Sequence, residues 1–350
     1  MENLKETMRD VLENNILSYW LTKVKDEENG GFYGRVDGND QVHPEAEKGA
    51  VMNARILWAF SAAYRVLKKP EYLEAATRAK EYVRDYFLDR EYGGIYWSVC
   101  VFIPESQTLE AVTPESSYLV GVKFGEFEAM LADLPEKLGE TIPDFHNMEF
   151  RMQQLREAVA QNAAGRMEKV QSLVDDIEKD ADEMCAAERL YREGKLPKRI
   201  CHCDTKVSNM LFDKDGNVLC VIDLDTTMPS FVFSDFGDFL RSAGNTAPED
   251  EPDLNKIHFN MDIFRAFAKG YIESAKSFLT PLEIEMLPYA VMLFPYMQAV
   301  RFLADYINGD TYYQIKYAEH NYVRTLAQYK LYQEARRAVP EMKEYISSLL

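Results

Sequence analysis

Residues 202–209 read His-Cys-Asp-Thr-Lys-Val-Ser-Asn, and residues 222–225 read Ile-Asp-Leu-Asp. The chain between them holds two short runs rich in strand-forming residues, joined by Asp-Lys-Asp-Gly-Asn, which is typical of a tight turn. The pattern therefore predicts a small β-hairpin. Closure of this hairpin brings Asp204 and Asn209, at its start, close to Asp223 at its end.

These three residue types suit phosphoryl transfer. A carboxylate such as Asp204 can orient an alcohol nucleophile, whereas amide and carboxylate oxygens from Asn209 and Asp223 suit Mg²⁺, which prefers hard oxygen ligands. Phosphoryl transfer needs this division of labour, because one group positions the hydroxyl and others hold metal against the phosphates. The alternative is that the two aspartates only cap loops.

Helical periodicity dominates the rest of the chain, so we expect a mainly α fold with a small β component. One further strand is expected at 96–103, which is β-rich and ends before a proline. Helices are expected at 4–25, 45–67, 71–87 and 114–134, across a polar stretch at 149–192 that suits a solvated helical hairpin, and at 236–242, 263–276, 280–307, 312–336 and 339–349.

Composition narrows the function classes. The 350 residues are 47% hydrophobic and carry a net charge of −18, which argues for a packed core and against nucleic-acid or anionic-membrane partners. Five scattered cysteines fit a reducing compartment, and the Cys-His-Cys at 201–203 has no second pair to complete a zinc site. Residues 1–14 are charged and lack an apolar signal segment, so we expect a cytoplasmic protein.

Residues 96–335 resemble the aminoglycoside phosphotransferase-like kinases, and within them the N-acetylhexosamine 1-kinases. The supporting stretches are 124–127 (Phe-Gly-Glu-Phe), 142–147 (Ile-Pro-Asp-Phe-His-Asn), 202–209, 221–229, 235–238 (Asp-Phe-Gly-Asp) and 301–310 (Arg-Phe-Leu-Ala-Asp-Tyr-Ile-Asn-Gly-Asp). The resemblance implies a kinase-like C-terminal lobe that uses ATP and Mg²⁺ to phosphorylate a small sugar.

The resemblance also implies roles for individual residues. Asp204 is the base that accepts or orients the sugar hydroxyl proton, and Lys206 faces the transferred phosphate. The metal ligands are Asn209 and Asp223. The backbone of Phe102 and Ile103 meets adenine, and Arg301 and Asp305 reach the sugar. Two alternatives stay open, since Arg301 could instead form a structural salt bridge and His202 is better suited to brace the loop than to act as a base.

The segment before residue 96 does not resemble a kinase N-terminal lobe. Residues 31–36 (Gly-Phe-Tyr-Gly-Arg-Val) match the end of a glycine-rich phosphate loop, but no strand with a V-A-I-K lysine follows. Lys48 is the only lysine at a plausible distance, and it opens a predicted helical segment. We therefore expect neither the phosphate loop nor the strand lysine in this part of the chain.

Residues 1–97 instead resemble the start of N-acylglucosamine 2-epimerases, cellobiose 2-epimerases in particular. The resemblance rests on 16–20, 28–34, 48–49, 53–58 and 91–97, and includes a Gly-Gly-x-Tyr turn repeated 63 residues apart, at 30–33 and 93–96. It implies a fragment of an α/α barrel in which Arg55 contacts sugar. The family's catalytic histidines lie further along its barrel, and the only histidine in this stretch is His43.

We therefore predict two parts, an epimerase-like α/α hairpin fragment at 1–95 and a kinase-like hinge strand and catalytic lobe at 96–350. Three functions follow from this composite. The first is a sugar kinase weakened by the missing phosphate loop and lysine. The second is a non-catalytic protein that binds sugar or nucleotide, and the third, least favoured, is a sugar 2-epimerase. In each case the expected partner is a small-molecule sugar.

Overall fold

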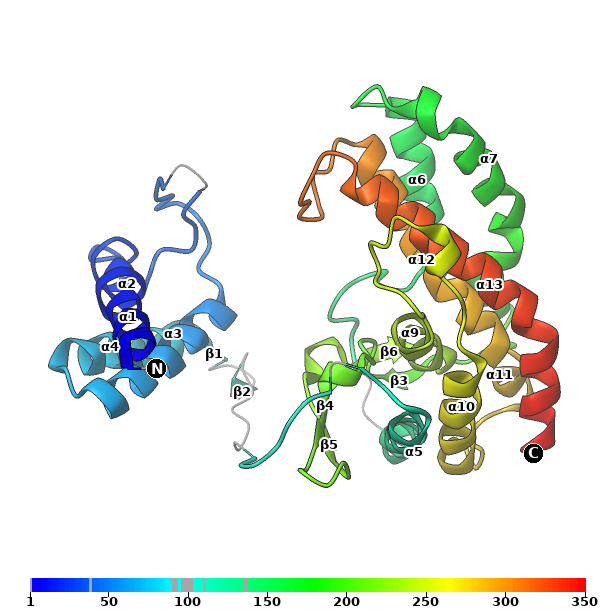
Figure 1. Ribbon diagram of the computed structural model, residues 1–350, viewed down its shortest axis with the longest axis horizontal. Coiled ribbons are helices and arrows are strands. Elements are labelled where there is room, and N and C mark those ends of the chain that lie inside the picture. Colours follow the sequence, from blue (N-terminus) through cyan, green and yellow to red (C-terminus); the bar gives the residue numbers. More distant parts are fainter. Residues whose placement is uncertain (1, 38–39, 90–93, 96–102, 110, 135–137) are drawn as a thin grey trace. The chain divides into compact units, whose positions relative to one another are not determined.

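The computed structural model describes residues 2–350 except 38–39, 90–93, 96–102, 110 and 135–137. The chain divides into two compact units, Met1–Phe102 and Ile103–Leu350 (Figure 1). Both are dominated by helices, which confirms the predicted mainly α fold with a small β component. Among the helices that the structure describes, none combines the length and the apolar composition needed to cross a membrane.

The first unit is built from helices and one short hairpin. Its elements are α1 (Glu2–Asp10), the π-helical segment η1 (Val11–Leu17), α2 (Ser18–Thr22), α3 (Ala50–Leu67), α4 (Pro70–Tyr86), and the antiparallel strands β1 (Leu88–Asp89) and β2 (Gly94–Ile95). Helix α4 starts at Pro70, where the missing N–H costs nothing. Buried rings form the core, with Phe32 stacked on Phe60 at 6.3 Å and Phe60 6.0 Å from Tyr72.

The loop before α3 is fixed by close contacts. Gly31 has φ +61°, and a Cβ there would lie 2.6 Å from the ring of Tyr82, so glycine is required. The Arg78 side chain donates from Nε to the Gly31 carbonyl at 2.9 Å. The second copy of the Gly-Gly-x-Tyr turn includes Gly93 and Tyr96, which lie outside the described residues.

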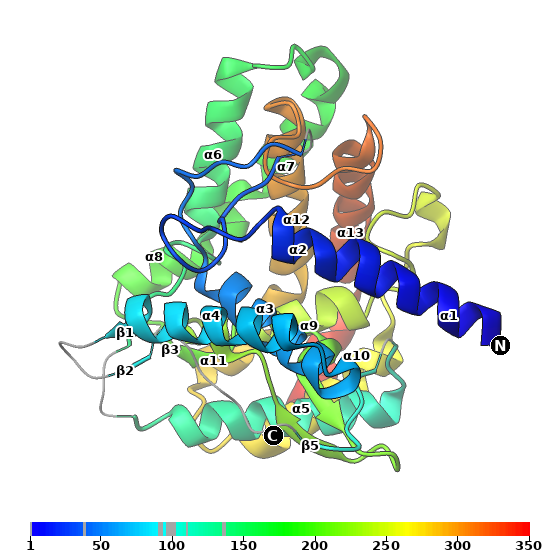
Figure 2. The same ribbon diagram turned by 90° about the vertical axis from the view of Figure 1, so that its left-hand side faces the viewer.

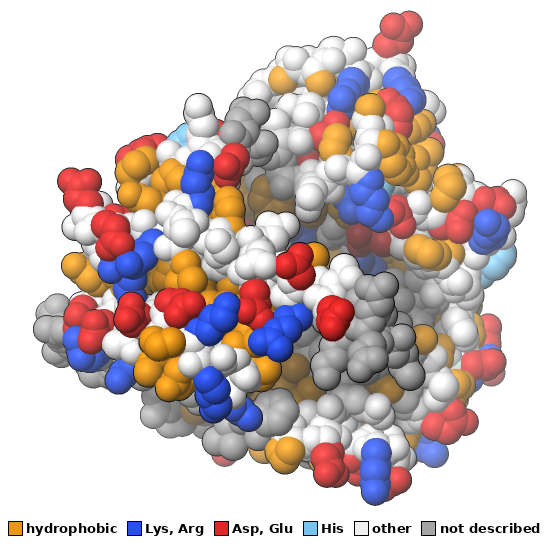
Figure 3. Space-filling view, turned by 60° about the vertical axis from the view of Figure 1, so that its left-hand side comes forward, with side chains coloured by type: hydrophobic (Ala, Val, Ile, Leu, Met, Phe, Trp, Pro, Cys, Tyr) orange, Lys and Arg blue, Asp and Glu red, His pale blue; other side chains and the backbone are white. Residues whose placement is uncertain are grey.

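Part of this unit's apolar surface is uncovered. Ile56 and Phe60, on one face of α3, are buried, but Trp58 and Val66 are 74% and 79% exposed. Together with side chains of α1 and η1, Trp58 and Val66 line an apolar groove. Figure 3 shows hydrophobic side chains exposed between charged ones on the face that it presents.

The second unit holds nine of the described α-helices, the two longest among them (Figures 1 and 2). They are α5 (Pro114–Leu131), α6 (Met148–Gln161), α7 (Met167–Met184), α8 (Ala186–Arg192), α9 (Phe233–Ala243), α10 (Met261–Ala275), α11 (Pro281–Glu285), α12 (Leu287–Ile307) and α13 (His320–Ser348). Helix α12 is buried along nearly its whole length and packs against α6, α9 and α13. Helices α5 and α10 pack closely because each has a glycine at the contact. A Cβ on Gly121 would lie 2.3 Å from a carbonyl oxygen of α10, and a Cβ on Gly270 would lie 2.2 Å from a carbonyl oxygen of α5.

Two small antiparallel sheets carry the functional loops. Strand β3 (Arg199–Cys201) pairs with β6 (Met228–Ser230), and β4 (Met210–Phe212) pairs with β5 (Val218–Val221). The second pair is the hairpin predicted from the sequence. Short 3₁₀ turns, η2 (Val207–Asn209), η3 (Leu224–Thr226) and η4 (Leu254–Lys256), connect the elements.

Several predicted boundaries were wrong. The expected helices 312–336 and 339–349 form one helix, α13, with Pro340 inside it, whereas the helices expected across 149–192 are α6 to α8. The helix expected from residue 45 begins at Ala50. The strand expected at 96–103 falls almost entirely outside the described residues.

Candidate active site

The loop between β3 and β4 brings three predicted residues together. Lys206 Nζ lies 2.7 Å from Asp204 Oδ2, and Asn209 Nδ2 donates to both the carbonyl oxygen and Oδ2 of Asp204 at 2.9 Å. Asn209 is buried, whereas the Asp204 side chain keeps 29% of its surface exposed. The carboxylate is therefore held in one orientation while remaining open to a small molecule.

Helix α9 holds this loop from beneath. Asp235 is fully buried and accepts hydrogen bonds from the backbone N–H of His202 at 2.6 Å and of Cys203 at 2.7 Å. Asp238 accepts the backbone N–H of Thr205 at 3.0 Å. Hydrogen bonds to carboxylates are stronger than neutral ones, so these contacts fix the left-handed turn at Cys203, where φ is +64°.

The hairpin places Asp223 beside this loop. The backbone N–H of Ile222 donates to the Asn209 carbonyl at 2.9 Å, so Asp223 follows directly on the residue that pairs with Asn209. His202 Nε2 donates to the Ile222 carbonyl at 2.9 Å, which is the bracing role predicted for His202. Asp223 itself has φ +62° and an exposed side chain.

The donor set at this end of the hairpin fits a magnesium ion. Because the Asn209 amide nitrogen is turned toward Asp204, its amide oxygen points away from that residue. That oxygen and the Asp223 carboxylate are hard ligands of the kind Mg²⁺ prefers.

Two cavities meet at Arg301. One, of about 110 Å³, is lined by Asp204 and Asp238 among others, and the second, of about 190 Å³, is lined by Arg151, Asp305 and Tyr312 among others. Arg301 lies over the rings of Phe145 and Tyr313 and donates to Gln298 at 3.2 Å. None of the ion pairs between described residues includes Arg301, so the salt-bridge alternative has no support there.

Asp305 organises the wall of the larger cavity. One carboxylate oxygen accepts the backbone N–H of Thr311 at 2.9 Å and of Tyr312 at 2.8 Å. The other accepts the backbone N–H of Tyr313 at 3.0 Å and the Asn321 side chain at 2.9 Å. Both oxygens are therefore occupied by the loop that follows α12.

The surroundings of Arg301 are positively charged. Burial, followed by the charges of Arg301 and Arg151, lowers the pKa of His146 to about 3, so this ring is neutral at ordinary pH. Burial and Arg301 also lower the pKa of Arg151. Arg301 and Arg151 favour ligand groups that accept hydrogen bonds, and Asp305 lines the same cavity.

The remaining predicted residues lie elsewhere. Ile103 begins the second unit, and its carbonyl accepts the Ser106 hydroxyl at 2.8 Å, but Phe102 lies outside the described residues. Arg55 is exposed on α3 in the first unit. Lys48 is nearly buried, 2.5 Å from the buried carboxylate of Asp26, and donates to the Gly30 carbonyl at 2.6 Å.

Sequence reasoning missed the residues that support the loop. It interpreted 235–237 as a helix-anchoring turn, but these residues lie inside α9, and Asp235 and Asp238 hold the loop. Two acids three residues apart among the phenylalanines of this helix were the available signal, because buried carboxylates need partners.

Comparison with curated proteins finds cellobiose 2-epimerases. Over 98 residues the chain is 54% identical to a cellobiose 2-epimerase of Bacteroides fragilis, and over 90 residues it is 40% identical to one of Ruminococcus albus. The first match covers 28% of this chain and 25% of the relative, and the second covers 26% of this chain and 23% of the relative. The chain thus spans about a quarter of the length of the curated relatives that it matches.

Among solved structures, one similar chain comes from a kinase family. A choline/ethanolamine kinase family protein from Mesorhizobium loti aligns with a TM-score of 0.43 at 16% identity, covering 75% of this chain and 76% of that one. The model of the phosphotransferase enzyme family matches residues 54–270, which is well over half of the sequence. The chain belongs to the phosphotransferase enzyme family.

Proposed function

We propose that this chain transfers the γ-phosphoryl group of ATP to a hydroxyl of a small sugar, an N-acetylhexosamine in the first instance, and does so slowly. The observation that carries the proposal is the junction of Asp204, Lys206 and Asn209 in one partly open loop, with Asp223 adjacent through the hairpin. Bound between Asn209 and Asp223, Mg²⁺ would neutralise phosphate charge.

Asp204 acts on the acceptor. Its carboxylate orients the attacking hydroxyl and takes the proton from the hydroxyl oxygen as the new P–O bond forms and the bond from the γ-phosphorus to the leaving ADP breaks. Lys206, 2.7 Å from this carboxylate, reaches toward the transferred phosphoryl group. The backbone at Ile103 contacts adenine.

A sugar fits the acceptor cavity better than a cationic alcohol does. Arg301 and Arg151 supply hydrogen-bond donors and positive charge, and Tyr312 and Tyr313 supply rings on which a pyranose can pack. Arg301 contacts the sugar directly. Asp305 acts indirectly, because its two oxygens hold the loop that carries both tyrosines.

Turnover is slow because the phosphate-binding half of a kinase site has no counterpart upstream. Lys48 is engaged by Asp26 and Gly30, so it cannot hold nucleotide phosphates. Each missing electrostatic contact costs on the order of 10²–10³ in rate. This same observation favours a second candidate, a protein that binds sugar with little or no transfer.

A 2-epimerase is the least favoured function. The only histidine in the epimerase-like stretch is His43, and its ring lies 3.0 Å from Asp37 and 3.2 Å from Glu45 in a loop. No second histidine precedes residue 103 to return the proton that the first would remove.

A phosphorylation assay tests the proposal. The chain is incubated with Mg·ATP and N-acetylglucosamine, N-acetylgalactosamine or hexoses, alongside Asp204→Asn and the control Asp215→Asn, in the exposed hairpin turn. We expect sugar phosphate from the parent and the control, and a loss of about 10²–10⁴-fold in Asp204→Asn. Sugar binding without phosphorylation supports the second candidate. Epimerised cellobiose without ATP supports the third.

A further inference from the structure

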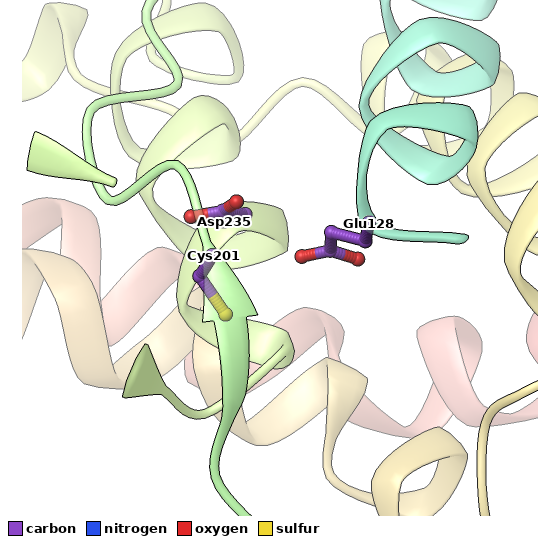
Figure 4. Close-up of side chains that lie close together, drawn as sticks. All are labelled: Glu128, Cys201 and Asp235. Atoms are coloured by element: carbon purple, nitrogen blue, oxygen red, sulfur yellow. The ribbon is translucent and has the colours of Figure 1, made fainter. Parts of the chain in front are cut away.

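Three side chains outside the cavities described above meet in the interior of the second unit. They are Glu128 of α5, Cys201 of β3 and Asp235 of α9, and their polar atoms lie within 4.8 Å of one another. Figure 4 shows the carboxyl group of Glu128 facing the other two. All three residues are at most 1% exposed.

Hydrogen bonds account for nearly every polar atom of this cluster. Both oxygens of Asp235 accept backbone N–H groups of the 202–205 loop, and the Cys201 thiol donates to the Arg199 carbonyl at 3.5 Å. The Tyr271 hydroxyl donates to Glu128 Oε2. The exception is Glu128 Oε1, which is buried and has no hydrogen-bond partner among the described residues.

We propose that Glu128 Oε1 carries a proton in the folded protein and donates it toward Asp235, which makes Glu128 a positioning residue for the loop that holds Asp204. Any effect of Glu128 on phosphoryl transfer rests on the proposed function. The proton between Glu128 and Asp235, called the shared proton below, does not depend on that function.

The cluster has room for one negative charge. Two buried carboxylates this close cannot both ionise without a large cost, so one of them keeps its proton. Asp235 holds the charge, because two backbone N–H groups stabilise its ionised form. Burial, and then the charge of Asp235, raises the pKa of Glu128 well above its usual range.

The neighbouring groups leave that assignment intact. Arg199 is the nearby cation, but its guanidinium is paired with Glu283 at 2.6 and 2.9 Å. The other charged or titratable groups that influence the pair are Asp238, His202, Cys201, Glu283 and Tyr271. Asp238 and Glu283 are acidic, and they raise the cost of a second negative charge.

A bound metal ion explains the cluster less well. A metal would need the Cys201 thiolate, but burial and the adjacent carboxylates raise the pKa of that thiol. Asp235 would also have to bind the ion through oxygens that already accept two backbone N–H groups, and one oxygen of Glu128 already accepts the Tyr271 phenol. A proton on Glu128 Oε1, the polar atom without a partner, leaves all of these hydrogen bonds in place.

Infrared spectroscopy tests the shared proton directly. A buried protonated carboxyl group gives a carbonyl band distinct from that of carboxylates, and we expect this band at pH 7 in the parent chain. It should be absent from Glu128→Gln and retained in Glu126→Gln, a control at an exposed position of the same helix. A parent without the band, or a band that persists in Glu128→Gln, overturns the proposal. The measurement needs no kinase activity.

Hydrogen exchange tests the positioning role. We expect Glu128→Gln, whose amide can still donate to Asp235, to keep the His202 and Cys203 amides protected. Glu128→Leu, which cannot donate, should expose them about tenfold more. Equal exchange of the His202 and Cys203 amides in the two variants overturns the positioning role. If Glu128→Leu does not fold, rapid exchange of these amides in Glu128→Gln overturns it instead. One zinc per purified chain, lost in Cys201→Ser, would overturn the shared proton in favour of a metal.

Discussion

The buried pair of Arg199 and Glu283 offers a test of what holds the candidate site in place. The guanidinium donates to both carboxylate oxygens, at 2.6 and 2.9 Å, and to the Phe278 carbonyl at 3.0 Å. The Glu283 side chain is 1% exposed and also caps α11 by accepting the Thr280 N–H at 2.7 Å. Since Arg199 opens β3, which leads directly into the 202–209 loop, the pair connects that loop to α11.

Replacing Glu283 with Gln leaves a largely buried guanidinium without its counter-charge. Breaking a buried pair in this way costs roughly 3–5 kcal/mol. For a unit of this size, each 1 kcal/mol lowers the melting temperature by about 2–4 °C, so we expect a fall of roughly 6–20 °C. The control is Glu149→Gln, because Glu149 accepts a similar two-point contact from Arg192, at 2.7 Å to each oxygen, on the exposed surface. That change should cost about 0–1 kcal/mol.

The two units can be followed separately in this assay. All three tryptophans precede residue 103, so tryptophan fluorescence follows the first unit, whereas far-ultraviolet circular dichroism follows the helices of both. We expect Glu283→Gln to lower the dichroism transition and leave the fluorescence transition unchanged. Equal shifts for Glu283→Gln and Glu149→Gln would refute the argument from burial, and a moved fluorescence transition would refute the independence of the two units.

Three further changes test other parts of the structure. Lys48→Met leaves the buried Asp26 carboxylate without its cation, so we expect the free energy of unfolding of the first unit, followed by fluorescence, to fall by roughly 3–5 kcal/mol. The unfolding of the second unit, followed by circular dichroism, should not change. Asp305→Ala removes the acceptor for three backbone N–H groups at 311–313, so hydrogen exchange there should accelerate about tenfold or more and sugar binding by calorimetry should weaken. Glu128→Gln should flatten the pH dependence of stability, because the folded parent keeps a proton on Glu128 that the unfolded chain loses above the ordinary carboxyl pKa. Between that ordinary value and the raised pKa of Glu128, the free energy of unfolding of the parent should fall by about 1.4 kcal/mol per pH unit. Urea titrations at several pH values should show this fall in the parent and not in the variant.

The parts of the site that depend on local sequence were predictable. The 202–209 motif and the β4–β5 hairpin lie within 22 residues of one another, and turn chemistry alone brings Asn209 near Ile222. The bracing role of His202 also followed, because the adjacent Asp204 better suits the chemistry of a base. Spacing therefore carried most of the information about the loop itself.

Long-range support was not predictable in the same way. Asp235 lies 33 residues after His202, and Glu128 lies far before both, so only packing of α5, α9 and β3 brings them together. The predicted break between residues 336 and 339 was wrong for a related reason. Pro340 indicated a break, but α13 continues past it, since Met342 and Ile346 are buried in the core and tertiary packing outweighs local propensity.

The contacts that set Asp204 all originate within 37 residues of one lobe. Lys206 and Asn209 orient its carboxylate, and Asp235 and Asp238 accept N–H groups of the residues on either side of it, so each of these contacts lies within the described residues of the second unit. The groups that a kinase uses to hold nucleotide phosphates have no such local source, and the nearest candidate, Lys48, is committed to Asp26. Acceptor orientation and phosphate binding are therefore separable here, and for that reason we expect sugar binding to survive in a chain whose rate of transfer is low.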